Sequence, residues 1–143
     1  MAGAEGVTMD EPKLHVPPRS VFAAILLNAM DSPTRDQSDW PTIVHLSNKI
    51  LELKRDLRLD ISNIPIRADR NGWISDDFSS FVNRFVLFGL AENEPVRLSN
   101  QARQVCEKIL AEDSEKHAEQ VGTLVHALGL DLRSAKQNLP SPI

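Results

Sequence analysis

The chain has 143 residues, of which 41% are hydrophobic and 25% charged, and a formal net charge of −4, an ordinary composition for one globular domain. The sequence excludes a membrane span, because no apolar run approaches the ~20 residues that a span needs, and it begins without the basic and apolar regions of a secretory signal. The composition predicts a packed core, and the lack of a secretory signal predicts a cytoplasmic protein. The acidic balance disfavours an extended nucleic-acid-binding surface, which is usually strongly basic.

The two ends of the chain carry little apolar periodicity. We expect residues 1–16 to form a disordered N-terminal arm and residues 131–143 an irregular C-terminal tail, with a short helix from Ser134 as an open alternative. Residues 17–130 are then one domain. Its first helix should begin at Pro18 or Arg19, since proline is tolerated in a first helical turn. Four apolar residues share one face of this helix: Phe22, Ile25, Leu26 and Met30.

The second helix has the most regular apolar seam. Asp39 is its expected N-cap, with Pro41 in the first turn. Apolar residues then follow at alternating spacings of three and four: Ile43, Leu46, Ile50, Leu53 and Leu57. Residues 64–68 alternate as a strand does, but Pro65 restricts them to an edge strand or an extended loop. Asn71-Gly72 after them is a strong turn signal.

The third helix should begin at Ser75, a good N-cap, with Asp76 and Asp77 favouring the positive end of the helix dipole. Four of the five phenylalanines of the chain lie between Phe78 and Phe88. We therefore expect this helix to be the centre of the core, and Gly89 to be the left-handed residue that ends it.

A short hairpin is expected over residues 90–98, and Ser99 should cap a fourth helix. The apolar face of that helix contains Ala102, Val105, Cys106, Ile109 and Leu110. We expect a break at residues 112–114 and then a fifth helix that ends at Gly129.

This order of helix, helix, extended segment, capped helix, hairpin and helix resembles winged-helix domains. In winged-helix families of the MarR and PadR kind, a helix that ends in glycine and leucine leads into the wing, as Gly89-Leu90 would here. The second strand of the wing ends in leucine and a capping Ser or Thr, as Leu98-Ser99 would. Residues 71–75 resemble the entry loop of small bacterial winged-helix proteins. The resemblance covers about residues 40–111 and implies a mainly α fold with a small β-hairpin, a winged-helix-like single domain with flanking helices.

By this resemblance, the third helix would enter the major groove of duplex DNA and the chain would be a transcription regulator. Asn83 and Arg84 would reach base edges, while Arg67, Arg70 and Arg97 would contact phosphates. Helices one and five flank the central segment, as dimerisation helices often do, so a homodimer is one expectation; packing of both helices on their own core is the other.

The sequence also departs from the DNA-binding pattern. Asp76 and Asp77 at the leading end of the third helix would repel phosphate oxygens, and Glu92 and Glu94 place negative charge at the wing tip. The alternative function is a protein–protein interaction module that keeps the winged-helix shape without binding nucleic acid. Helix one, helix five or the acidic surface of helix three would then contact the partner.

No catalytic or metal-binding constellation is apparent. The four histidines, His15, His45, His117 and His126, lack zinc-site spacings. Cys106 is expected to be a buried structural cysteine. No phosphate-binding loop, nucleophile elbow or dinucleotide fingerprint is present. We therefore expect no enzymatic activity, no metal and no cofactor.

Overall fold

The computed structural model describes residues 13–30, 41–93 and 95–130. Its helices and strands are, in chain order, α2 (Pro18–Met30), α3 (Ile43–Leu57), β1 (Arg67–Asp69), β2 (Gly72–Ile74), α4 (Asp76–Leu87), β3 (Ala91–Glu92), β4 (Arg97–Leu98), α5 (Asn100–Ser114) and α6 (Ala118–Ala127). The fold is mainly helical with two short antiparallel hairpins, which confirms the predicted fold class of helices with a small β-hairpin. None of the described helices is both long and apolar enough to cross a membrane.

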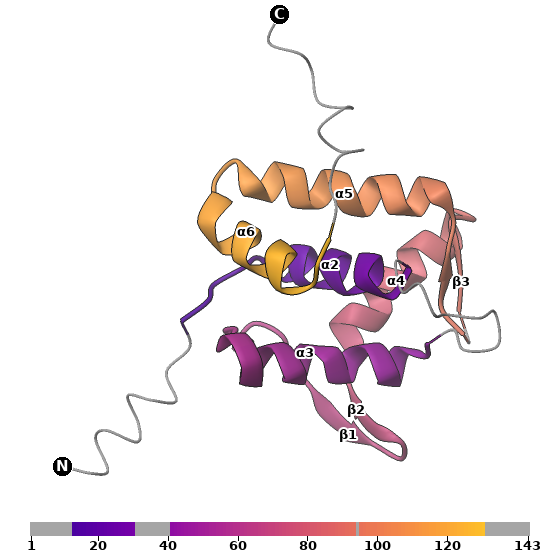
Figure 1. Ribbon diagram of the computed structural model, residues 1–143. Helices are drawn as coiled ribbons and strands as arrows, with labels where there is room; N and C mark the ends of the chain where they lie inside the picture. Colours follow the sequence, from indigo (N-terminus) through magenta and orange to yellow (C-terminus); the bar gives the residue numbers. More distant parts are fainter. Residues whose placement is uncertain (1–12, 31–40, 94, 131–143) are drawn as a thin grey trace, which may run out of the picture.

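Helix α2 lies at the centre of the molecule, with α5 and α6 on one side of it and α3 on the other (Figure 1). Nine of its thirteen residues are buried. The prediction that the third helix forms the centre of the core was therefore wrong. A helix that is apolar around its whole circumference must be covered on all sides, and only α2 has such a sequence. Its burial also means that α2 packs on its own core, which is the second of the two arrangements expected for this helix from the sequence.

Helix α3 begins at a different cap from the one predicted. The hydroxyl of Thr42 accepts a hydrogen bond from the backbone N–H of His45 at 3.2 Å, so the first turn is capped by Thr42; Asp39 lies outside the described residues. The apolar seam of α3 is buried as expected, through Ile43, Leu46, Ile50 and Leu53.

The N-terminal part of the domain begins earlier than residue 17. Leu14 and Val16, which were placed in a disordered arm, are both buried. Leu14 forms a parallel bridge with Leu59, just beyond the end of α3. Residues 13–16 therefore belong to the packed domain, because they cover apolar side chains at the end of α3; residues 1–12 lie outside the described part.

The predicted turn at Asn71-Gly72 joins β1 to β2, and the pair Ala68–Trp73 lies at the centre of this hairpin. Gly72 has a φ of 141°, a conformation that favours glycine. The expected entry loop of residues 71–75 thus contains a second strand. The backbone N–H of Ser75 donates to the buried hydroxyl of Ser47 at 3.1 Å, which fixes the start of α4 against α3.

Helix α4 begins and ends where the sequence predicted. Ser75 is its N-cap and accepts a hydrogen bond from the N–H of Phe78 at 3.1 Å. Gly89 has a φ of 73°, and the N–H of Leu90 donates to the carbonyl of Phe85 at 2.8 Å, which is the pattern of a glycine-terminated helix. The second hairpin follows, and Ser99 caps α5 as expected.

Helix α5 is longer than predicted. It continues through residues 112–114, where a break was expected, and the turn lies at residues 115–117. The predicted helix break is not observed, because side chains of α2 hold Asp113, which stays inside α5. Val105, predicted on the buried face, is 38% exposed, whereas Cys106 is fully buried as expected. Gly129 follows α6 with a φ of 64°, and the alternative helix from Ser134 lies outside the described residues.

Candidate interaction surface

Arg67, a predicted phosphate contact, is held by a carboxylate at the start of α4. Its Nε donates to Asp76 Oδ2 at 2.9 Å and a terminal nitrogen donates to Oδ1 at 3.0 Å. These hydrogen bonds raise the pKa of Arg67 and lower the pKa of Asp76. The pair neutralises one of the two carboxylates at the leading end of α4, but it also occupies the guanidinium that was expected to meet DNA.

The other four predicted residues are spread over α4 and both hairpins. Arg70 is exposed at the tip between β1 and β2, and Asn83 and Arg84 are exposed in the C-terminal half of α4. Arg84 lies eight residues after Asp76, about 12 Å along the helix axis. Arg97 is partly buried on β4, which follows α4 in the chain. The structure therefore brings Asn83 and Arg84 together but not the set of five.

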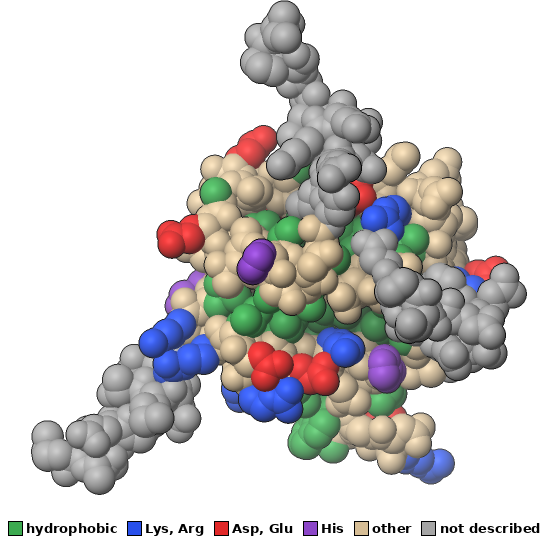
Figure 2. All heavy atoms as spheres, in the orientation of Figure 1, with side chains coloured by type: hydrophobic (Ala, Val, Ile, Leu, Met, Phe, Trp, Pro, Cys, Tyr) green, Lys and Arg blue, Asp and Glu red, His purple; other side chains and the backbone are tan. Residues whose placement is uncertain are grey.

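The segment that would face DNA has no excess of positive charge. Residues 67–98, from β1 to β4, hold four basic and five acidic side chains. Basic residues elsewhere also have acidic partners: Lys49 Nζ is 3.2 Å from Glu52, and Arg55 Nε is 2.9 Å from Asp56. Figure 2 shows acidic and basic side chains next to each other on the face that contains α3. Phosphate binding draws on a local excess of cations, and this arrangement does not supply one.

The end of α4 carries an apolar surface that sequence reasoning missed. Leu87 is 83% exposed and Phe88 79% exposed. The buried face that the sequence predicts for this helix contains Phe78, Phe81, Val82, Phe85 and Val86 and leaves Phe88 outside it. The helical period contained the signal: Phe78, Val82 and Phe85 are buried at spacings of four and three, so the next inward position falls at Gly89 and not at Leu87 or Phe88.

A cleft of about 280 Å³ opens directly beside Phe88. It is formed by the turn after α4 and by the second hairpin, and it is lined by Gly89, Leu90, Ala91, Glu92, Arg97, Leu98 and Ser99. The backbone around it is fixed, since the N–H of Ser99 donates to the carbonyl of Leu90 at 2.8 Å. We call residues 84–92 the α4–β3 corner. It contains two exposed apolar side chains, Leu87 and Phe88, next to a cleft with partly apolar walls.

A second cleft, of about 330 Å³, lies between α3 and α6. Ile25, Leu53 and Leu57 contribute its apolar lining, and Lys49 and Glu52 are among its polar residues. Figure 2 shows a strip of hydrophobic side chains across this face, between α6 and α3. Lys49 and Glu52 are already paired with each other. Lys49 and Glu52 therefore leave no unpaired charge in the cleft that would indicate a ligand.

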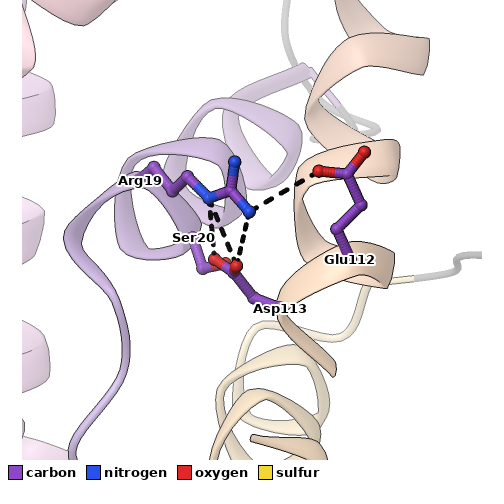
Figure 3. A network of polar contacts seen from close by, with 4 residues as sticks. All are labelled: Arg19, Ser20, Glu112 and Asp113. Atoms are coloured by element: carbon purple, nitrogen blue, oxygen red, sulfur yellow. Dashed lines mark hydrogen bonds and ion pairs between the residues drawn. The ribbon is translucent and has the colours of Figure 1, made fainter. Parts of the chain in front are cut away.

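The polar network of Figure 3 fastens α2 to α5. A terminal nitrogen of Arg19 donates to Asp113 Oδ1 at 2.6 Å, and the hydroxyl of Ser20 donates to Oδ2 at 2.5 Å. Burial by itself raises the pKa of Asp113, but these hydrogen bonds bring it below its ordinary value. Every oxygen of this carboxylate is occupied, so we assign the network a structural role.

Neither Cys106 nor the histidine and acidic side chains of the described ranges supply a candidate reactive thiol or metal-binding group. Burial raises the pKa of the Cys106 thiol to about 12, so it stays protonated and unreactive. No group of three or more histidine, cysteine, aspartate or glutamate side chains in the described ranges could hold a metal ion. The α4–β3 corner is thus the strongest candidate site in the part of the chain that the structure describes.

Comparison with known proteins adds no relative: neither a protein-family model, nor a curated protein, nor a solved structure matches the chain. The functional argument therefore depends on the chain's own residues.

Proposed function

We propose that this chain is a protein–protein interaction module of winged-helix shape that contacts its partner through the α4–β3 corner. The observation that carries the proposal is the exposure of Leu87 and Phe88, two large apolar side chains adjacent in sequence. Burying one such side chain contributes about 1.5–3 kcal/mol, and exposed aromatic anchors beside a pocket are typical of binding hot spots.

The charge of the surrounding surface supports a protein partner over a nucleic acid. The segment from β1 to β4 has a small excess of acidic side chains, and Asp77 remains at the leading end of α4 beside the Arg67–Asp76 pair. Protein interfaces have apolar centres with a mixed polar rim, and the corner has this composition. Helix α2, one of the contact surfaces considered from sequence, is buried and cannot serve.

Duplex DNA remains the second candidate, and one observation favours it. Arg70, Asn83 and Arg84 are exposed, and neither arginine forms an ion pair with any described residue. Arg70 protrudes at a hairpin tip, where a cation reaches a phosphate backbone without rearrangement of the fold. In this second candidate the chain is a winged-helix regulator whose α4 faces DNA, and Arg67, Arg70 and Arg97 contact the DNA phosphate backbone.

Site-specific photo-crosslinking in cells that produce the full chain tests the first candidate. A photoreactive residue at position 87 should form protein adducts, and one at Gln101, exposed on α5, should not. Replacing Phe88 with alanine should suppress the adducts at position 87. Equal adduct formation at both positions, or none at either, would overturn the proposal.

A DNA retention assay at low salt separates the two candidates, because phosphate contacts are strongest there. We expect no retention of mixed-sequence duplex at about 20 mM salt. Retention that falls steeply with salt, and that is lost in an Arg70→Ala/Arg84→Ala variant, would replace the first candidate with the second.

A further inference from the structure

We propose that the partner of the α4–β3 corner is a second copy of this chain, joined in a two-fold symmetric dimer in which each Phe88 ring enters the cleft of the other copy. This inference rests on the proposed function and names its partner. It is carried by three features of the corner: a ring with no cover, a cleft of matching size and charges of opposite sign on the two sides of the ring.

The first feature is that the described residues of the chain leave Phe88 exposed. The ring is 79% exposed although the cleft begins at the next residue. Its backbone is fixed by the end of α4: the N–H of Phe88 donates to the carbonyl of Arg84 at 3.2 Å, and that of Leu90 to Phe85 at 2.8 Å. Because these bonds hold the turn, the described residues leave the ring open to contact by another molecule.

The second feature is the size of the cleft. Its volume of about 280 Å³ exceeds the roughly 150 Å³ of an apolar cavity that accommodates benzene. Leu90, Ala91 and Leu98 in its lining also pack against the apolar core of the protein. The site can therefore contact a phenyl ring through these apolar side chains, while Glu92, Arg97 and Ser99 contribute polar groups to the rest of its lining.

The position of ring and cleft determines the symmetry. In a two-fold dimer the same patch is used twice, so that a residue of one copy contacts a site on the other and the reverse contact forms as well. Phe88 and the cleft adjoin each other in one patch. A two-fold dimer can thus fill both clefts at once. No unpaired patch is then left to which a third copy could bind.

The third feature is charge complementarity. Arg84 lies one helical turn before Phe88 and is exposed, and Glu92 is exposed in the lining of the cleft. Arg84 forms no ion pair with a described residue, and Glu92 lies opposite Arg97 in the pairing of β3 with β4. When Phe88 enters the second copy's cleft, Arg84 approaches the Glu92 that lines it, and the symmetry makes this contact twice. A patch that carries a positive and a negative side chain beside its apolar centre is complementary to a second copy of itself.

The apolar area is modest, because a buried Phe or Leu removes on the order of 150–250 Å² from water. Interfaces of this size are reversible. We therefore expect a dimer that forms at micromolar concentration and dissociates on dilution.

Sedimentation velocity of the purified full chain, from about 1 to 500 µM, tests the proposal. The sedimentation coefficient should rise from that of a monomer to that of a dimer, and Phe88→Ala should remain monomeric over the range. Trp73→Ala removes another exposed aromatic side chain, on β2 and outside the corner, and should dimerise like the parent chain. Circular dichroism should show both variants folded, since neither ring is in the core.

Charge reversal gives a second test that does not depend on removing apolar surface. Arg84→Glu and Glu92→Arg should each weaken self-association at least tenfold, since like charges then face each other twice. An equimolar mixture of the two variants should dimerise again, because both contacts of the mixed dimer join opposite charges: one keeps Arg84 with Glu92, and the other has the two signs exchanged. A mixture that stays monomeric while the parent chain dimerises would overturn the proposed geometry.

The two proposals fail in different ways. A parent chain that is monomeric throughout, with adducts to a different protein at position 87 in cells, would overturn the dimer and leave the interaction module standing. Absence of both self-association and adducts would overturn the two together.

Discussion

The two ends of α4 differ in how the chain completes them. At the N-terminal end, Ser75 caps the helix, Ser47 accepts a hydrogen bond from the Ser75 N–H, and Arg67 neutralises Asp76. At the C-terminal end the backbone is satisfied by the turn at Gly89, but Leu87 and Phe88 remain uncovered. Contacts within the described chain therefore complete the N-terminal end of α4, whereas the C-terminal end leaves two large apolar side chains exposed.

The largest expected effect separates a phenylalanine inside α4 from the one at its end. Phe78 is fully buried and stacks on Phe22 with ring centroids 5.1 Å apart. Phe78→Ala should lower the free energy of unfolding by about 3–5 kcal/mol. Phe88→Ala should change it by less than about 0.5 kcal/mol, as for an ordinary surface position. Urea denaturation at a concentration where the chain is monomeric measures both.

Equal destabilisation by the two substitutions would contradict this contrast, since it would mean that Phe88 is covered within a single chain. The self-association inferred above would then lose its central residue.

The next effect concerns the N-terminal cap. The hydroxyl of Ser75 is fully buried and satisfies the N–H of Phe78. Ser75→Ala should cost about 1 kcal/mol, the usual value for losing an N-cap. Ser80→Ala, at an exposed position of the same helix, is the matched control and should be neutral or slightly stabilising because alanine favours helices. Thermal unfolding followed by circular dichroism checks both, and a Ser75 variant as stable as the control would show that the cap does not hold this end.

A pair of glycines tests the backbone at the C-terminal end. Gly89 has a φ of 73° and no atom within 4 Å of where a Cβ would stand, so Gly89→Ala should destabilise by about 1 kcal/mol through backbone strain alone. Gly122 lies inside α6, also with open space around it. Gly122→Ala should stabilise by about 0.5–1 kcal/mol. Opposite signs in a denaturation experiment are the expected result, and equal signs would refute the left-handed turn that places Phe88.

The sequence predicted the two ends of α4 and the start of α5, which depend on local chemistry. Ser75, Gly89 and Ser99 were identified because caps and left-handed turns select few residue types. The centre of the core was misplaced, because a count of phenylalanines does not show that α2 is apolar on every side. The α4–β3 corner could be found only in part. The helical period places Phe88 off the buried face, but the cleft beside it depends on how the second hairpin folds back, which no local pattern reports.

The smallest expected effect tests the ion pair at the N-terminal end. The hydrogen bonds from Arg67 lower the pKa of Asp76, so the folded state binds this proton less readily than the unfolded chain does. The stability that the pair contributes is therefore fully present above the ordinary pKa of the carboxyl and is lost as pH falls through the lower folded value. Thermal unfolding between about pH 6 and pH 2 should show the parent chain losing its advantage over Asp76→Asn at the acidic end.

Two controls separate this pair from general acid unfolding. Asp77→Asn alters the neighbouring carboxylate, which forms no ion pair with a described residue, so its difference from the parent should be smaller at neutral pH. High salt should shrink the Asp76 difference, since both partners are exposed and the attraction is screened. A difference that ignores both salt and acid would show that the charge of Asp76 does not stabilise this end of the helix, since its attractions to Arg67 and to the helix dipole are both screened by salt and lost on protonation. The N-terminal end of α4 would then be completed by Ser75 and Ser47, and Arg67 would be released for the phosphate contact that the DNA candidate requires.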